Sequence, residues 1–198
     1  MNAEADAAPD LLRVSLDAKA TVKIGPFARG GKERVPVMAA DHDFRPQATV
    51  TPVGLFLPQT DELFIYHVTS KVTSDCLVDC LEQWWEAHKT RFASITTLVL
   101  NLDNGPENHS HRTQFMGRLA AFGERHQVSV RLAYYPPYHS KYNPVERCWM
   151  TRPRLITCPS YRTIASTTRS NGAGAFWRII GTARCSTRWR RCAASPPP

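Results

Sequence analysis

The most informative segments of the sequence are LVLNLDNGP at residues 98–106 and YYPPYHSKYNPVERCW at residues 134–149. The first part is an apolar run typical of a buried strand, and the Asn-Gly-Pro turn that follows Asp103 ends this strand at a carboxylate. In the second part, Asn143 suits a helix N-cap and the proline after it suits the first helical position, so Glu146 falls in the first turn of a helix. Two acids at the ends of two strands of one sheet favour a divalent metal.

Further strands are predicted nearer the N-terminus. Alternating apolar and polar residues predict a strand over Leu12–Asp17, with Thr21–Gly25 as its hairpin partner. Residues 26–58 are rich in glycine and proline and are predicted to be loop with at most short strands. A strong strand signal follows at Glu62–Val68.

Helices and strands alternate in the rest of the chain. A helix is predicted to begin with Thr73 or Ser74 as its N-cap and to carry apolar residues at helical spacing. We assign the pair Trp84-Trp85 on this helix to core packing. The remaining predicted elements are a strand at 97–102, a helix at about 112–126 and a strand at 128–133. This succession indicates an α/β fold.

The segments DNGPEN at residues 103–108 and YPPYHSKYNPVE at residues 135–146 resemble the catalytic region of DDE transposases. In particular, they are similar to the Rhodopirellula-type insertion-sequence family, a relative of the mariner-like group, over residues 11–149. The resemblance implies a ribonuclease-H-like fold for residues 11–150, with a mixed sheet flanked by helices. It also implies a function in DNA cleavage and strand transfer.

The resemblance implies that Asp17, Asp103 and Glu146 are the catalytic and metal-binding residues. In the fold of this family the first strand lies centrally, beside the strand that ends at Asp103, so the acids would converge. Mg²⁺ or Mn²⁺ binds such oxygen ligands and supports two-metal phosphoryl transfer. From the sequence alone, Asp41 or Asp43 could take the place of Asp17.

Loop residues near these acids are candidates for contact with DNA. The predicted DNA-binding residues are Asn104, His139, Lys141 and Tyr142. For Lys141 and Tyr142 a solvated turn is the alternative. Asn108 and His109 could likewise orient phosphate or water, whereas Glu107 is expected to be a solvated loop residue or to support a ligand.

The net charge of +8 belongs to the C-terminal tail. Nine arginines and no acidic residue follow Met150, and without these arginines 16 basic residues stand against 17 acidic ones. The body of the chain is therefore near neutral. A nonenzymatic nucleic-acid binder that uses the tail is the alternative function that this charge favours.

A membrane or secreted protein is not indicated. No window approaches the run of about eighteen apolar residues that a membrane span needs. Residues 1–9 lack the basic-then-apolar pattern of a signal peptide, so a cytoplasmic protein is expected. The six cysteines lack CxxC spacing, and Cys76 and Cys80, one helical turn apart, favour buried thiols over a zinc site.

Residues 1–10 are predicted to be a flexible arm. A transposase of the family carries a helix-turn-helix region ahead of its catalytic domain, and this arm is too short to contain one. We therefore expect site-specific recognition of DNA ends to be missing or supplied by another chain. The resemblance also implies a possible homo-oligomer, because family members act as multimers on paired ends.

Residues 151–198 form an Arg-rich tail without helical periodicity, which we expect to be irregular or disordered. If the third base of each codon is read with the first two of the next, residues 165–174 can encode KYNPVERCW, the sequence of residues 141–149. The same frame can continue as GVLEDHWNGALLDTVEAV through Cys192. Our hypothesis is that the tail is translated out of frame after a local duplication or rearrangement, and the nucleotide sequence of the gene tests it.

The shifted frame would encode an amphipathic helix that carries Glu146 and packs on the sheet, whereas the tail offers no such apolar face. A short helical stub is marginal in water. We therefore predict a transposase fragment with little or no strand transfer. A ribonuclease-H-like hydrolase that acts on RNA or on an RNA–DNA hybrid would share the carboxylates and is a further alternative.

Overall fold

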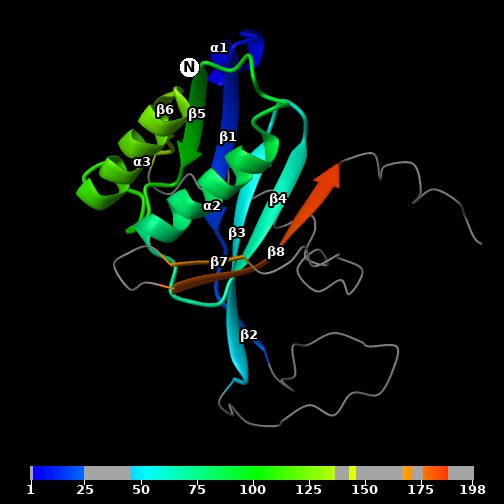
Figure 1. The fold of residues 1–198 in the computed structure, drawn as a ribbon, viewed down its shortest axis with the longest axis vertical. Helices are drawn as coiled ribbons and strands as arrows, with labels where there is room; N and C mark the ends of the chain where they lie inside the picture. Colours follow the sequence, from blue (N-terminus) through cyan, green and yellow to red (C-terminus); the bar gives the residue numbers. More distant parts are fainter. Residues whose placement is uncertain (1, 25–45, 137–142, 146–166, 171–175, 187–198) are drawn as a thin grey trace, which may run out of the picture.

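One mixed sheet dominates the part of the chain that the computed structural model describes, which is residues 2–24, 46–136, 143–145, 167–170 and 176–186. The strand order is β6-β5-β1-β3-β4-β8-β7, and β2 pairs with β3 beside this path (Figure 1). The strands are β1 (Leu11–Ala18), β2 (Val22–Ile24), β3 (Ala48–Leu57), β4 (Glu62–Val68), β5 (Thr97–Leu102), β6 (Ser129–Tyr134), β7 (Thr167–Ser170) and β8 (Phe176–Ser186). The helices are α1 (Asn2–Ala7), α2 (Ser74–His88) and α3 (Thr113–His126).

Parallel and antiparallel pairs occupy different halves of this sheet. β5 pairs parallel with β1 and β6 pairs parallel with β5, whereas β3 and β4 continue antiparallel on the other side of β1. Parallel neighbours need crossover connections, and α3 supplies the one between β5 and β6. The prediction of an α/β fold with a mixed sheet flanked by helices is confirmed.

The ten-residue strand β3 lies where the sequence predicted loop, within residues 26–58. It contains Pro52 and Gly54, yet every residue from Val50 to Leu57 is buried, and β3 pairs with β1 on one edge and β4 on the other. The prediction was wrong because burial and pairing outweigh the local turn preference of proline and glycine. The hairpin prediction for Thr21–Gly25 is also corrected, since β2 pairs with β3 and not with β1.

Helix α1 lies where the sequence predicted a flexible arm at residues 1–10. Ala5 is fully buried and clusters with Val99 of β5 and Ala133 of β6. The Asp6 carboxylate forms an ion pair of 2.7 Å with Arg13 of β1. These contacts dock the start of the chain onto the sheet.

Helices α2 and α3 cover the opposite face of the sheet from α1 (Figure 1). Side chains of β5 alternate between the two faces: Leu98 and Leu100 join the core beneath α2 and α3, whereas Val99 faces α1. Trp84 and Trp85 belong to the same core, so their assignment to core packing is confirmed.

Both long helices match the sequence pattern. Thr73 is the N-cap of α2, and its Oγ1 accepts a hydrogen bond of 3.4 Å from the Cys76 amide. On α3, Phe115, Leu119 and Phe122 are buried on one face, as predicted. The two helices are therefore amphipathic elements whose apolar sides build the main core.

Two segments of the Arg-rich tail extend the sheet beyond β4. β8 pairs antiparallel with β4, with a shift of register between Tyr66 and Val68, and β7 pairs antiparallel with β8. These segments are strands in a region expected to be irregular, and the other residues of the tail lie outside the described ones. Within the described part of the chain, no helix is long and apolar enough to span a bilayer.

Candidate active site at the ends of β1 and β5

The parallel pairing of β1 and β5 brings two predicted acids to the same level of the sheet. Ser15 lies opposite Asn101 in this pairing, and two further residues along each chain lead to Asp17 and Asp103. Because side chains of a strand alternate between faces and Leu16 points into the core, Asp17 falls on the face away from α2 and α3. Asp103 directly follows Leu102, the last residue of β5. Neighbouring strands lie about 4.8 Å apart, so the two backbones are close at this edge.

A tight turn after β5 holds the Asp103 carboxylate at the protein surface. Asn104 adopts a left-handed conformation with a φ of 62°, which asparagine tolerates better than most residues. The chain then turns back, and the Gly105 amide donates a hydrogen bond of 3.1 Å to Asp103 Oδ1. An aspartate commonly initiates a turn by accepting this bond. The predicted end of the strand at Asp103 is confirmed.

A second donor reaches the same oxygen of Asp103. Asn108 is only 5% exposed, and its Nδ2 donates a hydrogen bond of 3.0 Å to Asp103 Oδ1. Gly105 lies against this pair, because a Cβ at its position would be 3.3 Å from Asp103 Oδ1 and 3.3 Å from Asn108 Oδ1. The carboxylate, the amide and the turn therefore pack closely.

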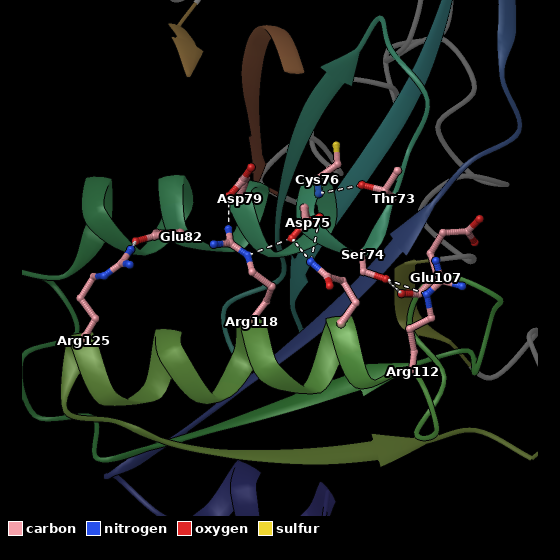
Figure 2. A network of polar contacts seen from close by, with 11 residues as sticks. Thr73, Ser74, Asp75, Cys76, Asp79, Glu82, Glu107, Arg112, Arg118 and Arg125 are labelled. Atoms are coloured by element: carbon pink, nitrogen blue, oxygen red, sulfur yellow. Dashed lines mark hydrogen bonds and ion pairs between the residues drawn. The ribbon is translucent and has the colours of Figure 1, made fainter. Parts of the chain in front are cut away.

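The loop that carries Asn108 is fastened to the sheet and to α2. The Tyr134 hydroxyl, at the end of β6, donates a hydrogen bond of 2.8 Å to the Asn108 carbonyl, and burial raises the pKa of Tyr134 so that this donor stays protonated. The Ser74 hydroxyl donates to the Glu107 carbonyl at 2.6 Å and accepts from Arg112 Nε at 3.3 Å (Figure 2). The position of the loop is therefore set by two elements of the core.

Asp17 is held more deeply than Asp103. It is 6% exposed, and its Oδ1 accepts a hydrogen bond of 2.9 Å from the Ala18 amide. On the antiparallel side it lies opposite Gly54, which has no side chain to cover it. One acid is therefore fixed within the sheet, whereas the other is exposed at its edge.

Asn143 connects the second family motif to β1. It is fully buried, and its Oδ1 accepts hydrogen bonds from the Ser15 hydroxyl and, at 3.3 Å, from the Val145 amide. The second bond is that of an N-cap, so the capping predicted for Asn143 is confirmed. Ser15 precedes Asp17 by two residues and shares its face of β1, so the helix start reaches the face that carries Asp17.

Two contacts of this site were not predicted from the sequence. Ser15 is a small polar residue inside an apolar strand, with the same alternation as Asp17, and this is the signal that could have identified it. Asn108 was considered only for a role in orienting phosphate or water. Its contact with Asp103 has no comparable signal, because it depends on how the loop folds.

Several predicted residues lie outside the described residues. They are Glu146, His139, Lys141 and Tyr142, together with the alternative first acids Asp41 and Asp43. Within the described residues, no group of three or more His, Cys, Asp or Glu side chains is placed to hold a metal ion. The three-acid set therefore stays a prediction, although Asn104 does lie exposed directly after Asp103.

The cysteine pair on α2 belongs to the main core. Cys76 and Cys80 are both fully buried in the core beneath the helix. A side-chain hydrogen bond with Cys76, together with burial, raises the pKa of Cys80 well above its usual value. The Cys80 thiol is therefore protonated at neutral pH.

A mixed α/β sheet that brings acids to the ends of two parallel strands is the arrangement expected of a DDE domain. The chain belongs to the family described as the Rhodopirellula transposase DDE domain, which it matches over residues 1–157. Membership supports a transposase-type function with DNA as the substrate, and DDE transposases in general use divalent metals. No curated protein and no solved structure matches the chain significantly.

Proposed function

We propose that this chain is a transposase domain of the ribonuclease-H-like kind, built for metal-dependent cleavage and strand transfer of DNA. The reacting centre is the sheet edge to which Asp17, Asp103 and Glu146 contribute. The parallel register of β1 and β5 is the observation that supports this proposal, because it leads to Asp17 and Asp103 at the same level of the sheet. The Asn143 contact with Ser15 supports the approach of the Glu146 segment to the same face.

The donors at this edge suit Mg²⁺ or Mn²⁺. Both hydrogen bonds described for Asp103 end on Oδ1, so Oδ2 remains available to a cation. Carboxylate oxygens are the ligands that these ions prefer. When bound, such ions activate an attacking water or 3′-hydroxyl and stabilise the leaving oxygen. The buried Asp17 gives the site a rigid side, and the exposed Asp103 gives it a side that a phosphodiester can reach.

DNA would approach from the exposed side of the turn after β5. Asn104 is exposed there, and its side-chain amide can donate to a phosphate oxygen beside Asp103. Lys141, Tyr142 and His139 complete the proposed DNA-binding set, because an ammonium, a hydroxyl and an imidazole can each contact phosphate. Such contacts position the substrate and carry no sequence information.

Activity in this form of the chain is expected to be weak. On our hypothesis, the shifted reading frame would encode an amphipathic helix that continues from Glu146, whereas the described residues of the tail form β7 and β8. Without an apolar helix face packed on the sheet, the segment that carries Glu146 loses its main source of stability. In the proposed site, the sheet and the turn after β5 hold Asp17 and Asp103, whereas Glu146 would lack a packed helix to hold it.

Nicking of supercoiled plasmid DNA in the presence of Mg²⁺ tests this function. The chain is compared with a restored-frame version in which GVLEDHWNGALLDTVEAV replaces the residues after Trp149. We expect faster nicking by the restored version and loss of nicking when it carries Asp103→Asn. Asp75→Asn is the matched control, because the Asp75 carboxylate contacts Gln114 and Arg118 of α3. Full activity of the Asp103→Asn variant would overturn the proposal.

One observation favours a nonenzymatic role in nucleic-acid binding, namely the nine arginines that follow Met150 without an acidic residue. Such a tail binds phosphates with an affinity that falls steeply as salt increases. A binder of this kind loses DNA when truncated after Met150 and is indifferent to Asp103→Asn. A ribonuclease-H-like hydrolase would instead cleave an RNA–DNA hybrid in preference to the plasmid.

A further inference from the structure

We infer that Asn108 is a positioning residue, which fixes the Asp103 carboxylate so that Oδ1 is held by the protein and Oδ2 is presented to the metal. The inference rests on the proposed function, in which Asp103 is a metal ligand. Asn108 contacts neither metal nor DNA in this role. It acts only through the carboxylate that it orients.

The Asp103 carboxylate is held by two hydrogen bonds to one of its oxygens. Two donors, Asn108 Nδ2 at 3.0 Å and the Gly105 amide at 3.1 Å, reach the same oxygen. One hydrogen bond would leave the carboxylate free to rotate, whereas two bonds from different directions fix the plane of the group. Both donors are neutral, so the carboxylate keeps its charge for a cation.

The oxygen of the Asn108 side-chain amide indicates why an amide stands at this position. Asn108 Oδ1 is buried and has no hydrogen-bond partner among the described residues. An unsatisfied buried acceptor is destabilising, and a leucine would fill a similar volume without this penalty. The presence of an amide is therefore explained by its donor, which is the group that contacts Asp103.

The backbone of Asn108 is fixed independently of its side chain. Its amide donates to the Gly105 carbonyl at 3.2 Å, and its carbonyl accepts from the Tyr134 hydroxyl at 2.8 Å. The side chain is therefore not needed to close the turn or to attach the loop to β6. Removing the side-chain donor should release the carboxylate while the loop keeps its fold.

Mn²⁺ binding to the full chain, followed by the EPR signal of the free ion, tests this role. Asn108→Leu keeps the apolar volume and removes the donor. Mutation of a group that orients a metal ligand typically weakens metal binding by about 10–100-fold, and we expect a loss in this range. Gln114→Leu is the matched control, because Gln114 Nε2 makes the same kind of amide–carboxylate bond to Asp75, at 2.9 Å, and should leave Mn²⁺ affinity unchanged.

A second measurement needs neither metal nor a folded Asn108→Leu variant. In the metal-free protein, the side-chain amide protons of Asn108 are followed by ¹⁵N-resolved NMR. Asp103→Ala removes the acceptor from an exposed position, so it should leave the fold intact. We expect it to shift the Asn108 side-chain signals and to speed their exchange with solvent.

The outcomes separate this role from the function on which it rests. The positioning role is overturned if the wild type binds Mn²⁺, Asp103→Asn does not, and Asn108→Leu binds like the wild type. It is also overturned if Asp103→Ala leaves the Asn108 signals unchanged. Absence of Mn²⁺ binding by the wild type would overturn the metal site itself, and the positioning role with it.

Discussion

Carboxylates are held in two opposite ways in this molecule, at the α2–α3 interface and at the ends of β1 and β5. Across the helix interface, arginines of α3 meet acids of α2 (Figure 2). Arg118 forms ion pairs with Asp75, at 3.2 Å, and with Asp79, and Arg125 forms one with Glu82. Each acid of this set therefore has a cationic partner within the protein.

The edge of the sheet differs because its exposed acid meets only neutral donors. Among the described residues, Asp103 accepts hydrogen bonds from the Gly105 amide and the Asn108 side chain, and no cationic side chain pairs with it. A neutral donor orients a carboxylate without cancelling its charge, whereas an arginine does both. The difference indicates that the interface acids hold two helices together and that Asp103 remains able to bind a cation.

Replacement of Asp103 by asparagine should have the largest effect on cation binding. Asp103→Asn keeps an acceptor oxygen and removes the charge, so we expect Mn²⁺ affinity to fall by about 100-fold, or roughly 2.7 kcal/mol. Stability should change by no more than about 0.5 kcal/mol, because the residue is exposed. Mn²⁺ titration and thermal melting measure the two effects, and unchanged Mn²⁺ affinity would contradict the prediction.

Removal of a cation from the interface should show the reverse pattern. Arg118→Met keeps the aliphatic stem and takes the guanidinium from Asp75 and Asp79, whose side chains are 29% and 11% exposed. We expect a loss of about 2 kcal/mol in the free energy of unfolding, a value within the usual penalty for a partly buried charged hydrogen bond. Calorimetry and Mn²⁺ titration should give a lower melting temperature and an unchanged affinity. A parallel loss of Mn²⁺ affinity would show that the two regions are not independent.

The sequence predicted the parts of this comparison that depend on local pattern. An apolar run closed by a turn located Asp103, and an N-cap before a proline located the helix start at Asn143, because neighbouring residues determine both. Strand β3 was missed because Pro52 and Gly54 have turn preferences that only pairing with β1 and β4 overcomes. Pairing partners far apart in the chain leave no local signal.

Contacts within the site were predictable only in part for the same reason. The register that leads to Asp17 and Asp103 follows from the order of strands, which the family resemblance supplied. The bond between Ser15 and Asn143 joins residues that are distant in sequence, and neither residue alone indicates the other. The ion pairs between α2 and α3 could likewise not be predicted from the sequence, since nothing in the sequence assigns an arginine on α3 to a particular acid on α2.

A smaller effect is expected from the bond that brings the second motif to β1. Ser15→Ala removes a hydroxyl donor from Asn143, which is fully buried, and should lower the free energy of unfolding by about 1 kcal/mol. Hydrogen exchange at the Val145 amide should become faster, since this amide binds the same Asn143 oxygen. Thr21→Val is the control, because it removes a hydroxyl contact of 2.8 Å with Thr51 that lies away from the helix start. Equal Val145 exchange in both variants would contradict the link.

The smallest effect on cation binding is expected from a change at Gly105, which lies against the Asp103 carboxylate. In Gly105→Ala the new Cβ would lie 3.3 Å from Asp103 Oδ1 and 3.4 Å from Oδ2, so the carboxylate must move by a few tenths of an ångström. A displacement of about 1 Å can cost about 100-fold in a reacting geometry, so this smaller shift should weaken Mn²⁺ binding by roughly fourfold.

Gly117→Ala on α3 is a matched control for this change, because nothing lies within 4 Å of its new Cβ. It should raise helix stability by up to about 1 kcal/mol and leave Mn²⁺ affinity unchanged. Equal Mn²⁺ affinities in the two alanine variants would mean that the Asp103 carboxylate adjusts freely. Its hydrogen bonds to Gly105 and Asn108 would then not orient it, and the contrast with the arginine-paired acids would be one of charge alone.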